Sequence, residues 1–131
     1  MPSEQQLKAD RVAYLIIASY NGEMAEIKRL LAKDTDVNAA NERGVTPLIA
    51  ATAGCQLSVV EFFLSLGADP TPQTDEGFNA FDFAFYNNDV GIARLIRIEG
   101  RWPKPMAPPI DITARISEEL LRRGGTGRPT L

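Results

Sequence analysis

The chain has 131 residues, of which 44% are hydrophobic and 24% are charged, and its formal net charge is −3. This length and apolar share suit one folded domain with a hydrophobic core. The longest apolar run, Val12 to Ala18, is far too short to span a membrane. The chain contains no histidine, which excludes Ser–His and Cys–His catalytic pairs and imidazole metal sites.

The first residues after Met1 are polar and carry no basic cluster, so we expect no signal peptide. Ser3 and Gln6 have the spacing of a capping box that opens the first helix. The single cysteine, Cys55, cannot form an internal disulfide, so nothing in the sequence favours secretion. We therefore expect a cytoplasmic protein.

Two stretches of the chain align without a gap at a spacing of 33 residues. Matching pairs include Gly44 with Gly77, Leu48 with Phe81, Ala51 with Ala84, Val59 with Ile92, and Gly67 with Gly100. A weaker upstream copy keeps the same frame at Leu15, Ala18, Gly22, Ile27 and Leu31. A fixed period of this length is typical of stacked repeats, each a small unit that cannot bury its apolar face alone.

Local sequence signals agree with a pair of helices in each repeat. Thr46 can cap a helix whose first turn contains Pro47. Gly44 and Gly77 fall at expected loop tips, where a positive φ is easy only for glycine. The second helix of the middle repeat is indicated by apolar residues at helical spacing, namely Leu57, Val60, Phe63 and Leu64.

Three short motifs resemble the ankyrin-repeat family. They are Thr46-Pro47-Leu48, Gly67-Ala68-Asp69-Pro70 and Asp36-Val37-Asn38-Ala39, and the resemblance extends over roughly residues 8 to 102. The chain departs from the family pattern at three places. Ile49 replaces the usual histidine, Cys55 stands where glycine is usual between the helices, and Asn79-Ala80 replaces Thr-Pro in the last unit.

The resemblance implies an all-α solenoid of about three helix pairs, which is the minimum for a stable stack. We expect the repeat domain to cover residues 1–102, with units at about 3–40, 41–73 and 74–102. Residues 103–123 are predicted to form a proline-rich linker and a capping helix, and residues 124–131 a flexible tail.

The predicted C-terminal segment is not a further repeat. Four prolines between Arg101 and Ile110 prevent regular helix there. An amphipathic helix is then expected from Asp111, and solenoids need their last apolar face covered. We expect Trp102, Ile112, Ile116 and Leu120 to cover the third unit. The alternative is that this helix docks on a partner.

The sequence offers no catalytic, cofactor-binding or metal-binding residues. Cys55 has no basic neighbour in sequence, so it is interpreted as a small residue at a helix junction rather than a reactive thiol. Asp82 is an isolated acidic residue in an apolar stretch, and it is expected to face solvent or to cap a neighbour. Gly124-Gly125-Thr126-Gly127 precedes Arg128-Pro129 instead of a helix, so it is not a phosphate-binding loop. We therefore expect no enzyme activity.

Charge is distributed unevenly. Residues 1–100 contain 8 Lys/Arg and 14 Asp/Glu, a net charge of −6, whereas residues 101–131 carry +3. An acidic body disfavours a nucleic-acid partner, because phosphates favour clustered Lys and Arg. The basic end is expected to fold back on the acidic body.

Ankyrin proteins bind through a concave face made of loop tips and the exposed side of each first helix, and the resemblance transfers that face onto this chain. The predicted partner-binding residues are Tyr20, Asn21, Glu42, Arg43, Val45, Asp75, Glu76, Phe78, Tyr86 and Asn87. Acidic tips would attract a basic partner, and Phe78 and Tyr86 would anchor it. Phe81, Phe83 and Phe85 are expected in the core.

The expected function is therefore non-enzymatic binding of another protein, by a chain that is monomeric when free and binds neither nucleic acid nor membrane. Two alternatives remain open at this point. The chain could be a structural subunit of a larger assembly, or an inhibitor or immunity-type protein directed at a specific enzyme or toxin.

Overall fold

The computed structural model describes residues 3–96, and these residues form helices joined by turns and loops, without a strand among them. The helices are α1 (Glu4–Asn21), α2 (Met24–Leu31), α3 (Pro47–Ala53), α4 (Leu57–Ser65), α5 (Ala80–Tyr86) and α6 (Val90–Leu95). The all-α solenoid class predicted from the sequence is confirmed. Trp102, the expected linker and capping helix at 103–123, and the tail at 124–131 lie outside the described residues.

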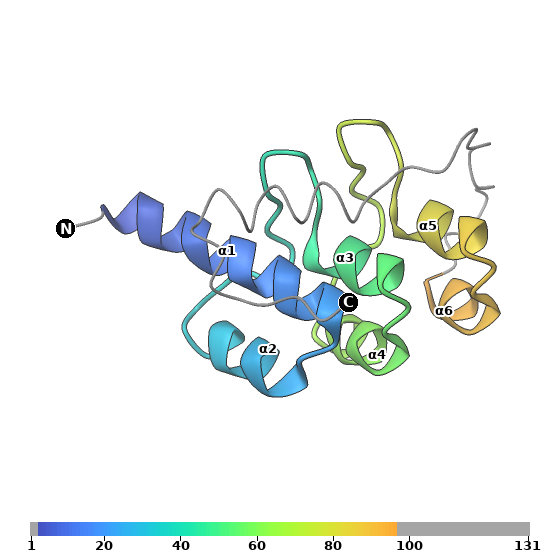
Figure 1. The fold of residues 1–131 in the computed structure, drawn as a ribbon, viewed down its shortest axis with the longest axis horizontal. Coiled ribbons are helices and arrows are strands. Elements are labelled where there is room, and N and C mark those ends of the chain that lie inside the picture. Colours follow the sequence, from blue (N-terminus) through green and yellow to red (C-terminus); the bar gives the residue numbers. More distant parts are fainter. Residues whose placement is uncertain (1–2, 97–131) are drawn as a thin grey trace.

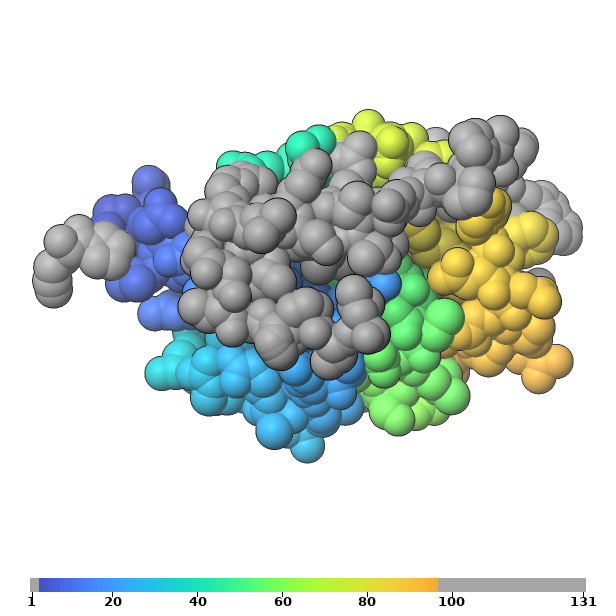
Figure 2. Space-filling model, viewed as in Figure 1, coloured from blue at the N-terminus to red at the C-terminus, as the bar shows by residue number. Residues whose placement is uncertain are grey.

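The helices are arranged as three antiparallel pairs (Figure 1). The pairs follow one another along the long axis in the order of the sequence (Figures 1 and 2). We call α1, α3 and α5 the inner helices and α2, α4 and α6 the outer helices. Inner helix α1 packs beside α3, and α3 packs beside α5, while outer helix α4 packs beside α6. Each pair therefore packs mainly against its neighbours in the stack.

The core runs through all three pairs. Its largest fully buried side chains include Leu15 and Ile27 from the first pair, Leu48 and Phe63 from the second, and Ile92 from the third. The outer helix α4 buries Val60 and Phe63 as the sequence predicts, but Leu57 at its first position is 44% exposed. The apolar spacing thus predicts the buried face of α4 correctly, whereas the N-terminal end of α4 lies outside the packed region.

Side-chain caps begin most of these helices. The backbone N–H of Gln6 donates to Ser3 Oγ (3.1 Å), which confirms the cap of α1, while the Gln6 side chain donates to Asp10 Oδ1 (3.1 Å) rather than serving as a reciprocal cap. At α3, Thr46 Oγ1 accepts from the backbone N–H of Ile49 (3.1 Å), and Pro47 occupies the first helical position. Each cap satisfies a backbone donor that the helix cannot satisfy itself.

A left-handed residue follows each inner helix at the same place in the repeat. Gly22, Cys55 and Asn88 are spaced 33 residues apart and have φ values of 75°, 57° and 59°. This conformation turns the chain sharply from inner to outer helix. Only glycine adopts it freely, asparagine tolerates it, and other L-residues are disfavoured there by about 1–2 kcal/mol.

Replacing Cys55 with glycine is expected to stabilise the fold by about 0.5–1 kcal/mol, because relief of the left-handed strain exceeds the added entropy of the unfolded chain. Thermal unfolding of the Cys55→Gly and Cys55→Ala variants measures this effect, since alanine keeps the Cβ and the strain. A glycine variant no more stable than the alanine variant would contradict the explanation.

Candidate functional site

Two loops project beyond the N-terminal ends of α3 and α5 (Figure 1). We call residues 41–45 and 74–78 the tip loops. In the first, the backbone N–H of Asn41 donates to the Val45 carbonyl (3.0 Å), and in the second, Thr74 does the same to Phe78 (2.8 Å). Gly44 and Gly77 have φ values of 79° and 88°, so both loops use glycine where the sequence predicts it.

The two tip loops are joined to each other. The backbone N–H of Asp75 donates to the Arg43 carbonyl (2.9 Å), and Arg43 Nη1 lies 3.9 Å from Asp75 Oδ2. The two charged side chains are about 40% exposed, 41% for Arg43 and 42% for Asp75, so the ion pair contributes little to stability. Glu42 and Glu76 are exposed on the same loops. The structure thus places four of the predicted site residues together.

Val45 does not belong to this surface. Its side chain is fully buried in the core cluster, and its backbone N–H donates to Asn41 Oδ1 (3.0 Å). The prediction that Val45 contacts a partner is wrong for this reason. The residue after the turn glycine lies at the base of the loop, where the chain enters α3 and its side chain turns inward.

Phe78 occupies the equivalent position one repeat later and is half-buried. Its ring meets that of Phe83 edge-on, with the ring centroids 6.4 Å apart. Phe78 therefore has a structural role in supporting the start of α5. Any contact that it makes with a partner comes through the part of the ring that remains exposed.

The remaining predicted residues lie at the C-terminal ends of α1 and α5. Tyr20 and Asn21 are half-buried, and the Tyr20 carbonyl accepts a hydrogen bond from Gln56 Nε2 (3.1 Å) of the next repeat. Tyr86 is 40% exposed, and Asn87, which caps α5, is also exposed. Tyr86 is the last of the seven residues of α5, so it lies about 10 Å along the helix axis from the tip loop.

Asp82 is a helix cap. It is 1% exposed, its Oδ2 accepts from the backbone N–H of Asn79 (2.9 Å), and Asn79 Oδ1 accepts from the backbone N–H of Asp82 (2.9 Å). This reciprocal pair replaces the Thr-Pro start that the last repeat lacks. Of the two roles considered from the sequence, solvent exposure is wrong and capping is confirmed.

Cys55 lies at the junction of α3 and α4, as its interpretation as a junction residue requires. Partial burial and the nearby Asp89 carboxylate raise the pKa of the Cys55 thiol, so little thiolate forms at neutral pH.

Within residues 3–96 no three His, Cys, Asp or Glu side chains are grouped in a way that could hold a metal ion. None of the helices described here is both long enough and apolar enough to cross a membrane.

The third pair exposes apolar surface that the sequence reasoning assigned to the core. Phe83 is buried and Phe81 is half-buried, but Phe85 is 58% exposed, so its assignment to the core is wrong. The 33-residue register contains the signal that could have shown this. Phe85 is equivalent to Thr52, which faces the following pair, and no further helix pair follows among the described residues.

Comparison with known proteins places the chain in a family. The family profile for ankyrin repeats in three copies matches residues 15–101, more than half of the chain. The chain is 32% identical over 82 residues to the palmitoyltransferase AKR1 of Lachancea kluyveri, an alignment covering 62% of the chain and 11% of that protein. It is 27% identical over 81 residues to the putative ankyrin repeat protein YahD of Escherichia coli, covering 62% of the chain and 40% of YahD.

A third relative is the human DNA-binding protein RFXANK, which is 42% identical over 64 residues, 48% of the chain and 25% of RFXANK. The chain thus spans well under half the length of each of these relatives. The ankyrin-repeat profile covers the helix pairs described above. This chain belongs to the ankyrin-repeat family.

Proposed function

We propose that the protein is a non-enzymatic interaction module that binds another protein across its tip loops and the ends of α1 and α5. Ankyrin repeats are in general protein-interaction modules. The observation that carries the proposal is the exposure of Tyr86, a large aromatic that is 40% exposed at the end of α5. The equivalent residue of the middle repeat is the much smaller Ala53. Exposed tyrosines are favoured at binding hot spots, because they bury much area at a low entropic cost.

Charge supports a partner with a basic surface. Residues 3–96 contain 7 Lys/Arg and 13 Asp/Glu, a net charge of −6. Three of these acidic residues, Glu42, Asp75 and Glu76, lie on the tip loops, where Arg43 is the only Lys or Arg. A field of this sign accelerates encounter with a positively charged protein and repels nucleic acid. Recognition then depends on how well the shape of the partner matches the surface that runs from the tip loops to Tyr86.

The Tyr86→Ala substitution is expected to weaken partner binding by about 2 kcal/mol, roughly 30-fold in Kd, with little effect on folding. The partner is first isolated by affinity purification on the full chain, and its affinity is then measured by calorimetry. Leu66→Ala is the matched control, because Leu66 is 48% exposed at the end of outer helix α4, outside the proposed surface.

An unchanged affinity for the Tyr86→Ala variant would reject the proposed surface, as would an equal loss in the Leu66→Ala control. Charge reversal at Asp75 and Glu76 is expected to slow association and to weaken its dependence on salt, while dissociation changes less. Phe78→Ala is less informative, because loss of its contact with Phe83 lowers stability as well.

A further inference from the structure

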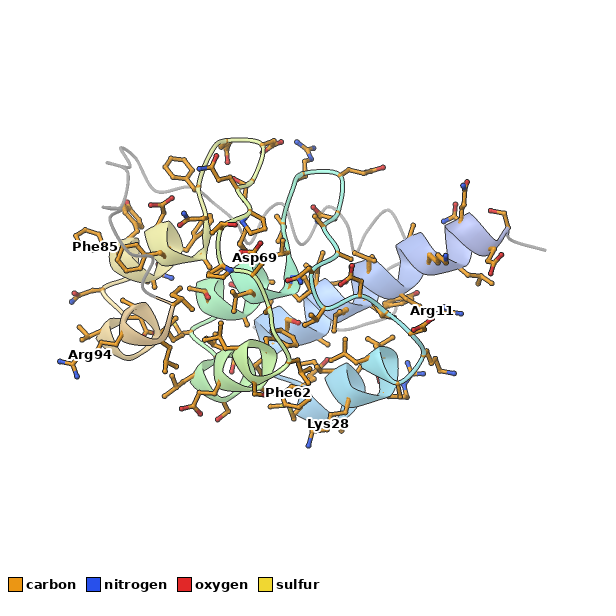
Figure 3. All side chains as sticks on the ribbon, turned by 180° about the vertical axis from the view of Figure 1, so that it is seen from behind. Arg11, Lys28, Phe62, Asp69, Phe85 and Arg94 are labelled. Carbon is orange, nitrogen blue, oxygen red and sulfur yellow. The ribbon has the colours of Figure 1, made fainter. Side chains whose placement is uncertain are left out.

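A largely apolar groove lies at the outer end of the third pair. Its volume is about 370 Å³, and its lining includes Phe81, Ala84 and Phe85 of α5 and Val90, Ala93 and Arg94 of α6. Phe85 and Arg94 both project from this end of the molecule, opposite the end marked by Arg11 (Figure 3). The residues that line the groove include neither Tyr86 nor any residue of the tip loops, so the groove is distinct from the proposed partner surface.

The repeat register shows what the groove corresponds to. Phe81, Phe85 and Ala93 are equivalent to Leu48, Thr52 and Val60 of the middle repeat, each at most 1% exposed. In the middle repeat α5 packs beside α3 and α6 beside α4, and we attribute the burial of these three residues to that packing. In the third pair the same face is open, with Phe85 58% exposed and Phe81 and Ala93 half-buried. The part of the groove formed by Phe81, Phe85 and Ala93 therefore corresponds to the stacking face of the last repeat. Val90 and Arg94 form its edge, since their equivalents Leu57 and Glu61 are exposed in the middle repeat.

The side chains of this face do not suit another repeat of the same kind. The position equivalent to Phe85 is Thr52 in the middle repeat and Ser19 in the first, both fully buried. A phenyl ring in place of a small hydroxyl side chain would overlap a helix pair stacked with the same geometry. An occupant with large side chains of its own, such as a single helix that lies between α5 and α6, fits the groove better.

The chain itself supplies such a segment. Residues 97–131 follow directly from α6, whose side chains form one wall of the groove. Residues 111–123 place Ile112, Ile116 and Leu120 at intervals of four, which puts them on one stripe of a helix. The intervening residues 97–110 can span up to about 45 Å when extended, so the segment reaches the groove easily.

A further argument favours this intrachain occupant. A tethered segment has an effective concentration in the millimolar range for a short linker, well above that of a second copy at ordinary protein concentrations. Residues 111–123 contain three arginines and three acidic residues, a net charge of zero, so their charge is compatible with a groove lined by both Asp89 and Arg94. We propose that residues 111–123 bind in the groove between α5 and α6 and close the open end of the repeat stack.

The test measures amide hydrogen exchange in the full chain. Protection of residues 112–121 is expected in the unmodified protein and is expected to fall at least about tenfold in the Phe85→Asp variant, because a charged carboxylate replaces the apolar ring on which the segment is proposed to pack. The Ile116→Asp variant should reciprocally speed exchange in α5 and α6. Leu66→Asp is the control, since it adds the same charge at an exposed leucine far from the groove.

Fast exchange of residues 112–121 in the unmodified protein would overturn the proposal, as would protection that survives Phe85→Asp. Light scattering distinguishes a second copy in the groove. Protection that increases with protein concentration, together with a dimer that Phe85→Asp dissociates, would also overturn it. Exchange in α1 to α4 reports whether each variant remains folded, and it is expected to stay unchanged.

Discussion

The Gly54→Ala variant is expected to lose about 3 kcal/mol of stability, a fall of roughly 10 °C in Tm. Gly54 ends α3 beside the last turn of α1. A Cβ at this position would lie 3.0 Å from the carbonyl carbon of Tyr20 and closer still to its oxygen. Because both obstacles are backbone atoms, no side-chain rotation can relieve the clash. The two inner helices would have to separate, which would strain the Gln56–Tyr20 hydrogen bond.

Gly91→Ala is the matched control and is expected to change stability in the opposite direction. Gly91 lies within α6, and a Cβ there would meet only Asp89 Oδ1, at an ordinary 3.7 Å. Alanine is the better helix former, so a gain of about 0.5–1 kcal/mol is expected. Thermal and denaturant unfolding of both variants measures the two effects. Equal changes in the free energy of unfolding for Gly54→Ala and Gly91→Ala would show that the close approach of α1 and α3 is not what makes Gly54 necessary.

The Asp82→Ala variant is expected to lose about 3 kcal/mol. Asp82 Oδ2 is the acceptor for the buried backbone N–H of Asn79, and alanine leaves that donor without its capping partner. The loss combines the value of a helix cap, about 1–2 kcal/mol, with the cost of an unsatisfied buried group, about 1–3 kcal/mol. The effect should be concentrated in the third pair, because α5 has only seven residues.

Asp82→Asn separates the cap from the charge. Asparagine has the same shape and keeps an acceptor oxygen, so a loss of about 1 kcal/mol or less is expected. Denaturant unfolding at neutral pH compares the two variants. If asparagine proved as damaging as alanine, the carboxylate charge rather than the hydrogen bond would be the source of the stability.

The repeat period predicts the helix pairs and their caps because these depend on local chemistry. Thr46 and Pro47 begin α3 as expected, and the turn glycines have positive φ values as expected. Cys55 also takes the left-handed conformation that its place in the pattern requires. At Thr46, Pro47 and the turn glycines, the residue type and its neighbours in sequence agree with the backbone found. At Cys55 the repeat register predicts the conformation, against the preference of the residue itself.

Side-chain burial is less well predicted, because it depends on what lies across space. The family pattern places Val45 next to a loop glycine and so suggests exposure, yet the loop base turns its side chain into the core. Phe85 is expected in the core because it replaces a smaller residue of the repeat pattern, yet it is 58% exposed, on the face that a following pair would cover. The partner-binding role of the remaining tip-loop and helix-end residues stays a prediction.

Contact only between neighbouring pairs gives the molecule a gradient of local stability. The middle pair, α3 and α4, has a helix pair on both sides, so its amides should be the last to exchange. The first and third pairs each have one such neighbour and should open earlier. A partner that contacted both Tyr20 and Tyr86 would connect the first pair to the third pair across the middle pair. Binding would then oppose local opening of the first and third pairs, and the three pairs would unfold as one cooperative unit.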